Sequence, residues 1–375
     1  MINYLILLVS ENSKSFCYYE SLSKKTGKTD IINFDLLKKS VLYAIKNKLG
    51  LNILYGDKPL PDKYEKELDK IEHIKILPIK LRKYYKKGIY IIEEADLKNV
   101  KKIKKNNELN LILRISKKLL PQLSEIFKIF LWKFKKLNLI FTDIDKFSEN
   151  DFLIYKEQIK IIEKQIYNLF IKGNHLELNF LTDRLFLQNM NNCDAGIKHL
   201  TIAPDGKFYL CPGFYYESRN NSLGTLDENY SIVFDELLKL KNSPICSNCD
   251  AWHCKRCFYL SKKITSEINI PSSKQCKISH IERNQTGILS DKLRKKSKSF
   301  KNLIPIPEVN YIDPFELLKA ESGITEDEKI TVISELLSKP LERLSVKELL
   351  MHLYSVDKEA IIKLKNYLYS KNENK

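Results

Sequence analysis

Four cysteines fall within twelve positions of one segment, PICSNCDAWHCKRCFYL, which covers residues 244–260. Two thiolates with two residues between them on a turn can bind the same metal ion, because the turn brings both sulfurs to one side. Seven thiolates are more than one four-coordinate site can use and one fewer than two such sites need. We therefore expect two sites, one of them with a ligand position that cysteine does not fill. The seven grouped residues are Cys193, Cys211, Cys246, Cys249, Cys254, Cys257 and Cys276.

Other ligand chemistries remain open for these cysteines. A disulfide framework is typical of secreted chains, but the start MINYLILLVSENSK has neither the basic region nor the cleavage site of a signal peptide. No run of about 18 apolar residues is long enough to span a membrane. We therefore expect a cytoplasmic protein with reduced thiols, in which iron–sulfur clusters or structural zinc are favoured over disulfides.

A few histidines and aspartates are weaker candidates. His253 lies inside the cysteine segment and is a candidate to complete the three-cysteine site, although such residues more often hydrogen-bond a cluster sulfur. Asp143 and Asp145 follow an apolar run, where substrate contact and helix capping are both open. The other histidines share no ligand spacing and are expected to be structural or to face solvent: His175, His199 and His280.

The net charge of +17 is a weak guide to function. Lysines are spread over most of the predicted helices, which favours solvated helix faces over a nucleic-acid surface. The densest basic run, at 291–302, has no interleaved aromatic residues, and we interpret it as an exposed linker. A nucleic-acid binder built on zinc ribbons is therefore the weakest of the functional hypotheses.

The elements that must position these residues follow a repeating pattern in the first half of the chain. Helical periods at 33–48, 121–136 and 151–173 lie between apolar runs, which favours a parallel sheet covered by helices. Without a Rossmann glycine fingerprint, the pattern indicates an α/β fold with a partial (β/α) barrel. The predicted strands cover residues 4–10, 51–56, 73–79, 88–94, 110–116, 137–143 and 176–182.

The pattern changes near residue 188. TIAPDGKFYLCP predicts a hairpin in which Gly206 supplies a positive φ. Cysteines, turns and short strands replace long helices up to about residue 287, and capping boxes at Thr325 and Ser345 predict a helical C-terminal tail. The predicted domains are 1–187, a partial barrel; 188–287, a cysteine-rich domain; and 288–375, a basic linker with a helical extension.

The order of the seven cysteines resembles the SPASM domain of radical SAM peptide-modifying enzymes. The family pattern is C-x9-15-G-x4-C, then C-x2-C-x5-C-x3-C, then C; this chain matches the first half and has one residue fewer in two later spacers. The resemblance implies two auxiliary 4Fe–4S clusters. One would use Cys193, Cys211 and Cys257, and the other Cys246, Cys249, Cys254 and Cys276.

Radical SAM enzymes also carry C-x3-C-x2-C after the first barrel strand, where three thiolates hold the cluster that binds S-adenosylmethionine. Counting back from Cys17, the other two places hold Lys14 and Ser10, and one cysteine cannot hold the cluster. A Gly-Gly-Glu-Pro segment often follows the second strand in these enzymes, and here GDKP stands in its place, with Lys58 reversing the charge. The alternative is that GDKP is a simple turn and Cys17 a small buried residue.

The whole chain resembles the CXXX-repeat peptide maturases, through SFCYYE, YGDKPLP, IEHIKILP, the cysteine segment and PEVNYIDPFE. The resemblance implies post-translational maturation of a ribosomally synthesised, cysteine-rich precursor peptide (a RiPP), whose thiolate could be the fourth ligand of the three-cysteine site. Without the full SAM motif, radical initiation would fall to a partner enzyme or reductase. The alternative is a non-catalytic, zinc- or cluster-stapled pseudoenzyme that presents the peptide to such a partner.

Overall fold

The computed structural model describes residues 2–20, 31–100, 109–131 and 134–306. The chain divides into two compact units, Met1–Val309 and Asn310–Lys375, and every described residue lies in the first. The predicted C-terminal capping boxes therefore lie outside the described residues. The domain boundaries expected near 187 and 287 stay predictions.

Eleven strands of the described residues form one sheet, in the order β11-β10-β9-β8-β1-β2-β3-β4-β5-β6-β7. From β1 to β7 each strand pairs in parallel with the next, which confirms the large parallel sheet expected from the apolar runs. These strands are β1 (Tyr4–Leu8), β2 (Gly50–Leu54), β3 (His73–Pro78), β4 (Ile89–Glu93), β5 (Asn110–Ile115), β6 (Lys136–Phe141) and β7 (Glu177–Leu178).

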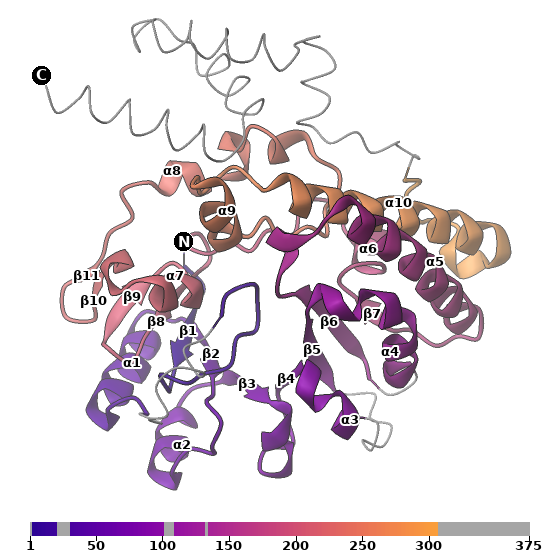
Figure 1. Ribbon diagram of the computed structural model, residues 1–375. Coiled ribbons are helices and arrows are strands. Elements are labelled where there is room, and N and C mark those ends of the chain that lie inside the picture. The colour runs from indigo at the N-terminus through magenta and orange to yellow at the C-terminus, as the bar shows by residue number, and fades with distance from the viewer. Residues whose placement is uncertain (1, 21–30, 101–108, 132–133, 307–375) are drawn as a thin grey trace, which may run out of the picture. The chain divides into compact units, whose positions relative to one another are not determined.

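Helices cover the outer side of this curved sheet (Figure 1). Asn33 caps the first helix by accepting the backbone N–H groups of Asp35 and Leu36, and Ser148 and Asp151 form a capping box at the start of the fifth. The core lies between these helices and strands that are apolar on both faces. The helices are α1 (Phe34–Lys46), α2 (Asp62–Leu68), α3 (Leu97–Val100), α4 (Leu123–Phe130) and α5 (Glu149–Ile171).

The cysteine-rich part continues the same sheet. β8 (His199–Ile202) pairs in parallel with β1 and in antiparallel with β9 (Lys207–Tyr209), and Gly206 in the turn between β8 and β9 has a φ of +78°. This is the predicted hairpin, although its second strand ends before Cys211. The remaining elements are α6 (Asp183–Phe186), α7 (Pro212–Glu217), β10 (Gly224–Thr225), β11 (Asn229–Tyr230), α8 (Asp235–Leu238), α9 (Phe258–Thr265) and α10 (Ser273–Lys296).

The long helix α10 corrects two predictions. Long helices do not stop at residue 188, and the run at 291–302 is not a free linker: α10 continues to Lys296, Leu293 is fully buried, and a 3-10 helix follows at Lys298–Phe300. Hydrophobic periodicity missed α10 because its buried face is largely polar. Some of those side chains are hydrogen-bonded to other elements; Tyr155 in α5, for example, donates to Glu282 at 2.6 Å.

Two other predicted elements are shorter than expected. The helical pattern at 121–136 gives α4, which ends at Phe130, and β6 already begins at Lys136. The run at 176–182 gives only the two residues of β7, because the Thr182 hydroxyl accepts the backbone N–H of Leu178 at 2.7 Å and turns the chain.

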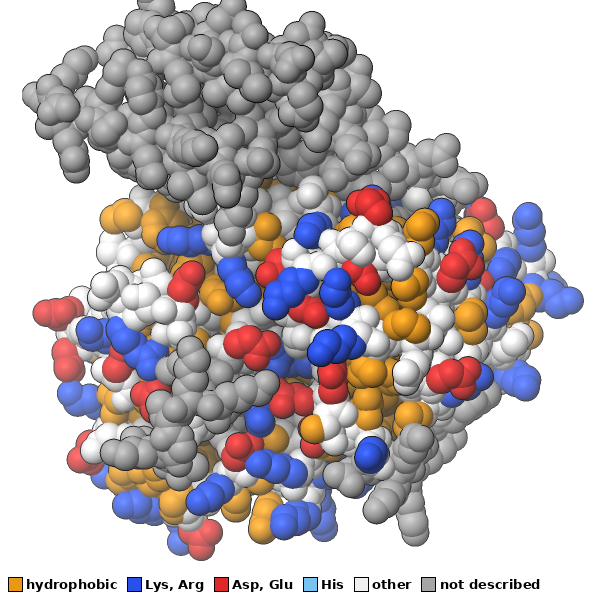
Figure 2. All heavy atoms as spheres, viewed as in Figure 1, with side chains coloured by type: hydrophobic (Ala, Val, Ile, Leu, Met, Phe, Trp, Pro, Cys, Tyr) orange, Lys and Arg blue, Asp and Glu red, His pale blue; other side chains and the backbone are white. Residues whose placement is uncertain are grey.

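Basic and acidic side chains are mixed over the face shown in Figure 2, with no continuous field of one sign among the described residues there. Many lysines have an acidic neighbour, such as Lys39 with Asp227 at 3.0 Å. None of the helices in the described part of the chain has the length and apolar character needed to cross a bilayer.

Candidate functional site

The segment after β1 lies inside the curve of the sheet, at the carboxyl ends of the parallel strands (Figure 1). The Ser13 hydroxyl donates to the carbonyl oxygens of Ser10, at 2.8 Å, and of Leu54, at 2.9 Å. A Cβ at Gly56 would lie 2.8 Å from the Ser10 hydroxyl oxygen, so only glycine lets the segments after β1 and β2 approach this closely. The two segments that resemble SAM-binding motifs are thus packed against each other.

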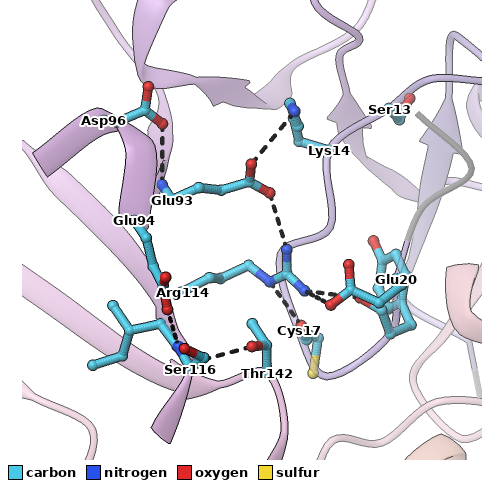
Figure 3. Close-up of polar contacts among 12 residues, drawn as sticks. Ser13, Lys14, Cys17, Glu20, Glu93, Glu94, Asp96, Arg114, Ser116 and Thr142 are labelled. Atoms are coloured by element: carbon cyan, nitrogen blue, oxygen red, sulfur yellow. Dashed lines mark hydrogen bonds and ion pairs between the residues drawn. The ribbon is translucent and has the colours of Figure 1, made fainter. Parts of the chain in front are cut away.

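Lys14, which stands at the second cysteine position of the SAM motif, is held by carboxylates. Its Nζ lies 3.5 Å from Glu93 at the end of β4 and 3.8 Å from Asp57 in the GDKP turn. Glu93 also pairs with Arg114 in β5 at 3.1 Å (Figure 3), and Asp57 pairs with Lys80 at 2.7 Å. Ion pairs therefore connect the carboxyl ends of β2, β3, β4 and β5 around Lys14.

Arg114 is the centre of this network, and its side chain is only 3% exposed. Its Nε donates to the carbonyl oxygen of Cys17 at 3.1 Å, and its Nη2 donates at 3.0 Å both to the carbonyl oxygen of Tyr19 and to Glu20. A buried guanidinium needs several acceptors to offset its desolvation. Arg114 thereby holds the backbone of the Cys17–Glu20 segment in one position.

Nearby acidic residues support strand ends. Asp143 accepts the backbone N–H of Lys117 at 2.8 Å, so it holds the turn after β5, as a capping group does. The backbone carbonyl of Asp145 accepts from Lys274 at 2.6 Å. Glu94 and Asp96 accept from the backbone N–H groups of Ser116 and Glu93 (Figure 3).

Four thiols from distant parts of the sequence gather next to the Arg114 network; we call them the first thiol group: Cys17, Cys193, Cys211 and Cys257. A hydrogen bond joins the thiols of Cys17 and Cys257; it lowers the pKa of Cys17 and raises that of Cys257. Burial, followed by the Cys17 thiol, raises the pKa of Cys193 to about 12. The structure thus brings Cys17 to the three cysteines predicted for one site.

The local chain explains how three of these thiols meet. The backbone N–H of Cys193 donates to the carbonyl oxygen of Lys255 at 2.7 Å, two residues before Cys257. Cys211 and Cys257 are the residues that immediately precede α7 and α9. A Cβ at Gly213 would lie 2.6 Å from the Tyr259 ring, so the glycine allows the starts of these two helices to approach.

A second thiol group comprises Cys246, Cys249 and Cys254, beside the first turns of α10. Burial and then the Cys254 thiol raise the pKa of Cys246 to about 12, and burial raises that of Cys249 to about 11. Side chains on α10 contact the sulfurs: Gln275 Nε2 lies 3.8 Å from Cys254, and His280 Nε2 lies 3.6 Å from Cys249. The fourth predicted ligand, Cys276, is buried on the same turns of α10.

The thiols have the surroundings that a soft metal or cluster requires. The backbone N–H of Ala251 donates to Cys249 Sγ at 3.4 Å, and the left-handed residues Asp194 and Arg256, with φ of +57° and +43°, turn the chain beside Cys193 and Cys254. Such N–H···S contacts stabilise thiolates. As the described side chains stand, no three His, Cys, Asp or Glu residues are arranged to hold a metal ion. The chemistry of the donor set, free cysteine sulfurs that are buried or half-buried, fits such a group.

The histidines take roles that sequence reasoning only partly anticipated. His253, a candidate fourth ligand, is buried with Nε2 3.0 Å from Glu282, so its partner is a carboxylate. His199 is structural, stacked on Tyr4 and 3.0 Å from its hydroxyl. His280 was missed as a sulfur contact; its spacing of four from Cys276 on one helix was the available signal.

Comparisons with known proteins bear on the fold. No protein-family model matches the sequence, and no curated protein matches it. The solved structure of hexahistidine-tagged anSMEcpe with bound AdoMet has a TM-score of 0.51 and 14% identity, over 80% of this chain and 97% of that chain. Native anSMEcpe with bound AdoMet and Cp18Cys peptide has a TM-score of 0.50 and 13% identity, over 78% and 99%. The chain therefore has a radical SAM-like fold.

Proposed function

We propose that this chain takes part in the maturation of a ribosomally synthesised cysteine-repeat peptide, as a radical SAM-type protein with two auxiliary 4Fe–4S clusters in a SPASM-like region. The support is threefold: the radical SAM-like fold, the peptide bound to one structural neighbour, and the two buried thiol groups. The fold alone would fit many reactions, so the thiol groups carry the proposal.

The carrying observation is that the two thiol groups adjoin in one segment of the chain. Cys254 of the second group and Cys257 of the first are separated by two residues, and the backbone N–H of Cys193 donates to the carbonyl oxygen of Lys255 between them at 2.7 Å. Burial, followed by the thiols of Cys17, Cys257 and Cys254, raises the pKa of the Tyr18 phenol well above its usual range. The seven late cysteines would hold two clusters, whose chemistry is one-electron transfer.

The chain's own residues would position the clusters and bind the peptide, without starting a radical reaction. Ser10 and Lys14 are not ligands that replace thiolate on a cluster, and Lys14 is engaged by Asp57 and Glu93. A partner enzyme would therefore supply the radical, and a reductase would supply electrons. Arg114 and its acceptors would hold the segment between the two sites in place.

A binding assay tests this proposal directly. Anaerobically purified full-length chain is titrated with a fluorescent synthetic peptide of Cys-x-x-x repeats. We expect saturable binding that is at least about tenfold weaker in Cys257→Ser, and unchanged in Ser247→Ala, a matched control in an exposed position of the same segment. Equal affinity of the wild type for a peptide with every cysteine replaced by serine would contradict the proposal.

A second candidate function is a non-catalytic, zinc-stapled pseudoenzyme that presents the peptide to its partner. The ion pairs of Lys14 favour it, because they join the strand ends where S-adenosylmethionine chemistry would be expected. Elemental analysis separates the two candidates. A brown protein with iron and sulfide supports the first, and a colourless protein with zinc supports the second.

A further inference from the structure

The site of Cys193, Cys211 and Cys257 has one ligand position that these three cysteines do not fill. We infer that Cys17 fills it, so that the last cysteine of the altered N-terminal motif joins Cys193, Cys211 and Cys257 in a four-thiolate centre. This inference rests on the proposed function, in which this group of thiols holds an inorganic centre. It adds a ligand and closes the position expected for a peptide thiolate.

Aromatic packing places the Cys17 segment against the other ligands. The Tyr19 ring stacks on Tyr216 of α7 at a centroid distance of 5.6 Å and meets the Tyr259 ring of α9 edge-on at 6.4 Å. Cys211 and Cys257 precede these two helices, so the segment that contains Cys17 packs against the two helices that begin after these cysteines.

The backbone of this segment is anchored on its other side. Arg114 donates to the carbonyl oxygens of Cys17 and Tyr19, at 3.1 and 3.0 Å, while the sulfur of Cys17 points away from the guanidinium (Figure 3). That sulfur forms its hydrogen bond with the thiol of Cys257. The Arg114 anchor therefore fixes the side of the segment from which the thiol projects.

Backbone contacts place the remaining two cysteines beside Cys257. The backbone N–H of Cys193 donates to the carbonyl oxygen of Lys255, two residues before Cys257, and Gly213, two residues after Cys211, lies against the Tyr259 ring, two residues after Cys257. Four cysteines are the donor set of a tetrahedral zinc or cluster site. A centre with four protein thiolates has no open position, so it would act in electron transfer or structure, and Cys257→Ser would weaken peptide binding through loss of the centre.

Metal stoichiometry tests this assignment without an activity assay. Metal and acid-labile sulfide are measured per chain for the anaerobically purified full-length wild type, Cys17→Ser, Cys257→Ser and the double variant. We expect about half of the wild-type metal in all three variants, because both residues would serve one of two centres. Ser15→Ala, a matched control at a buried position two residues away, should keep the full amount.

A second measurement uses the wild type alone, so it does not depend on how a variant folds. Cysteines are alkylated with N-ethylmaleimide before and after metal removal by a chelator and are mapped by mass spectrometry. Cys17 should become reactive together with Cys193, Cys211 and Cys257. Full metal in Cys17→Ser, or Cys17 reactivity that ignores the chelator, would overturn the inference. A wild type without metal would instead overturn the proposed function.

Discussion

Arg114 donates from its Nε to the carbonyl oxygen of Cys17 at 3.1 Å, a contact that joins the carboxyl end of β5 to the segment after β1. Arg114→Gln would leave Glu93 and two backbone carbonyls without their donor. We expect the free energy of unfolding to fall by roughly 2–3 kcal/mol, as for lost hydrogen bonds to a charged group. Urea unfolding measures the change.

Lys39→Ala is the control for this prediction, because the ion pair of Lys39 with Asp227 is exposed. Exposed pairs contribute about 0–1 kcal/mol, so this variant should unfold close to the wild type. An Arg114→Gln variant as stable as Lys39→Ala would show that the buried network does not hold the segment.

The residues after β1 lead to a prediction about S-adenosylmethionine. Because Ser10 and Lys14 stand in two cluster-ligand positions, the full-length chain with dithionite should form no 5′-deoxyadenosine from S-adenosylmethionine. Chromatography of the anaerobic reaction detects this product. Its formation in proportion to protein, and its loss in Cys17→Ser, would mean that the N-terminal motif still holds a cluster.

The close approach of α7 and α9 depends on Gly213. Gly213→Ala would place a methyl group 2.6 Å from the Tyr259 ring and push apart the helix starts that carry Cys211 and Cys257. We expect a destabilisation of about 1–3 kcal/mol, as for an overpacked core, together with loss of metal from the first thiol group. Calorimetry and elemental analysis measure both effects.

Gly173→Ala is the control for Gly213→Ala, because it strains the backbone without overpacking the core. Gly173 has a φ of +75°, and a Cβ added there would have no neighbouring atom within 4 Å, so alanine meets only the left-handed backbone penalty, about 1–2 kcal/mol. The metal content of Gly173→Ala should equal that of the wild type. Equal metal loss in both glycine variants would argue that general destabilisation, and not the helix approach, releases the metal.

Much of the parallel sheet could be predicted because its signals are local. Runs such as YLILLVS and NLILRIS are apolar on both faces, as buried parallel strands must be, and the turn at Gly206 has a local signature. The pairing of β8 with β1 joins Tyr4 to His199, and no local pattern encodes such a distant contact.

The candidate site was harder to predict for the same reason. The number of late cysteines indicated two sites, and the family resemblance implied how they divide, but the approach of Cys17 depends on how the sheet places the segment after β1. Arg114 was also missed, because a single arginine in an apolar strand has no distinctive pattern. The polar buried face of α10 hid a helix that contacts the thiols through Gln275 and His280.

His199 predicts a pH dependence of stability. Burial lowers its pKa from the usual 6.5 to about 4, so between these values the unfolded chain binds a proton that the folded chain does not. The free energy of unfolding should therefore fall as the pH drops from about 6.5 to 4, by up to about 1.4 kcal/mol per pH unit from this residue.

His199→Phe should remove this contribution, because phenylalanine keeps a ring against Tyr4 and does not titrate. Urea unfolding at several pH values measures each slope. The same slope in His199→Phe and wild type would assign the acid sensitivity to other groups.

The most direct test of the central claim, that two thiol groups hold two inorganic centres, is the iron and acid-labile sulfide content of the anaerobically purified full-length chain. We predict about eight iron atoms per wild-type chain, and about four in Cys193→Ser and in Cys246→Ser, which each remove one ligand of one group. A wild-type chain that binds neither iron nor zinc would contradict the claim.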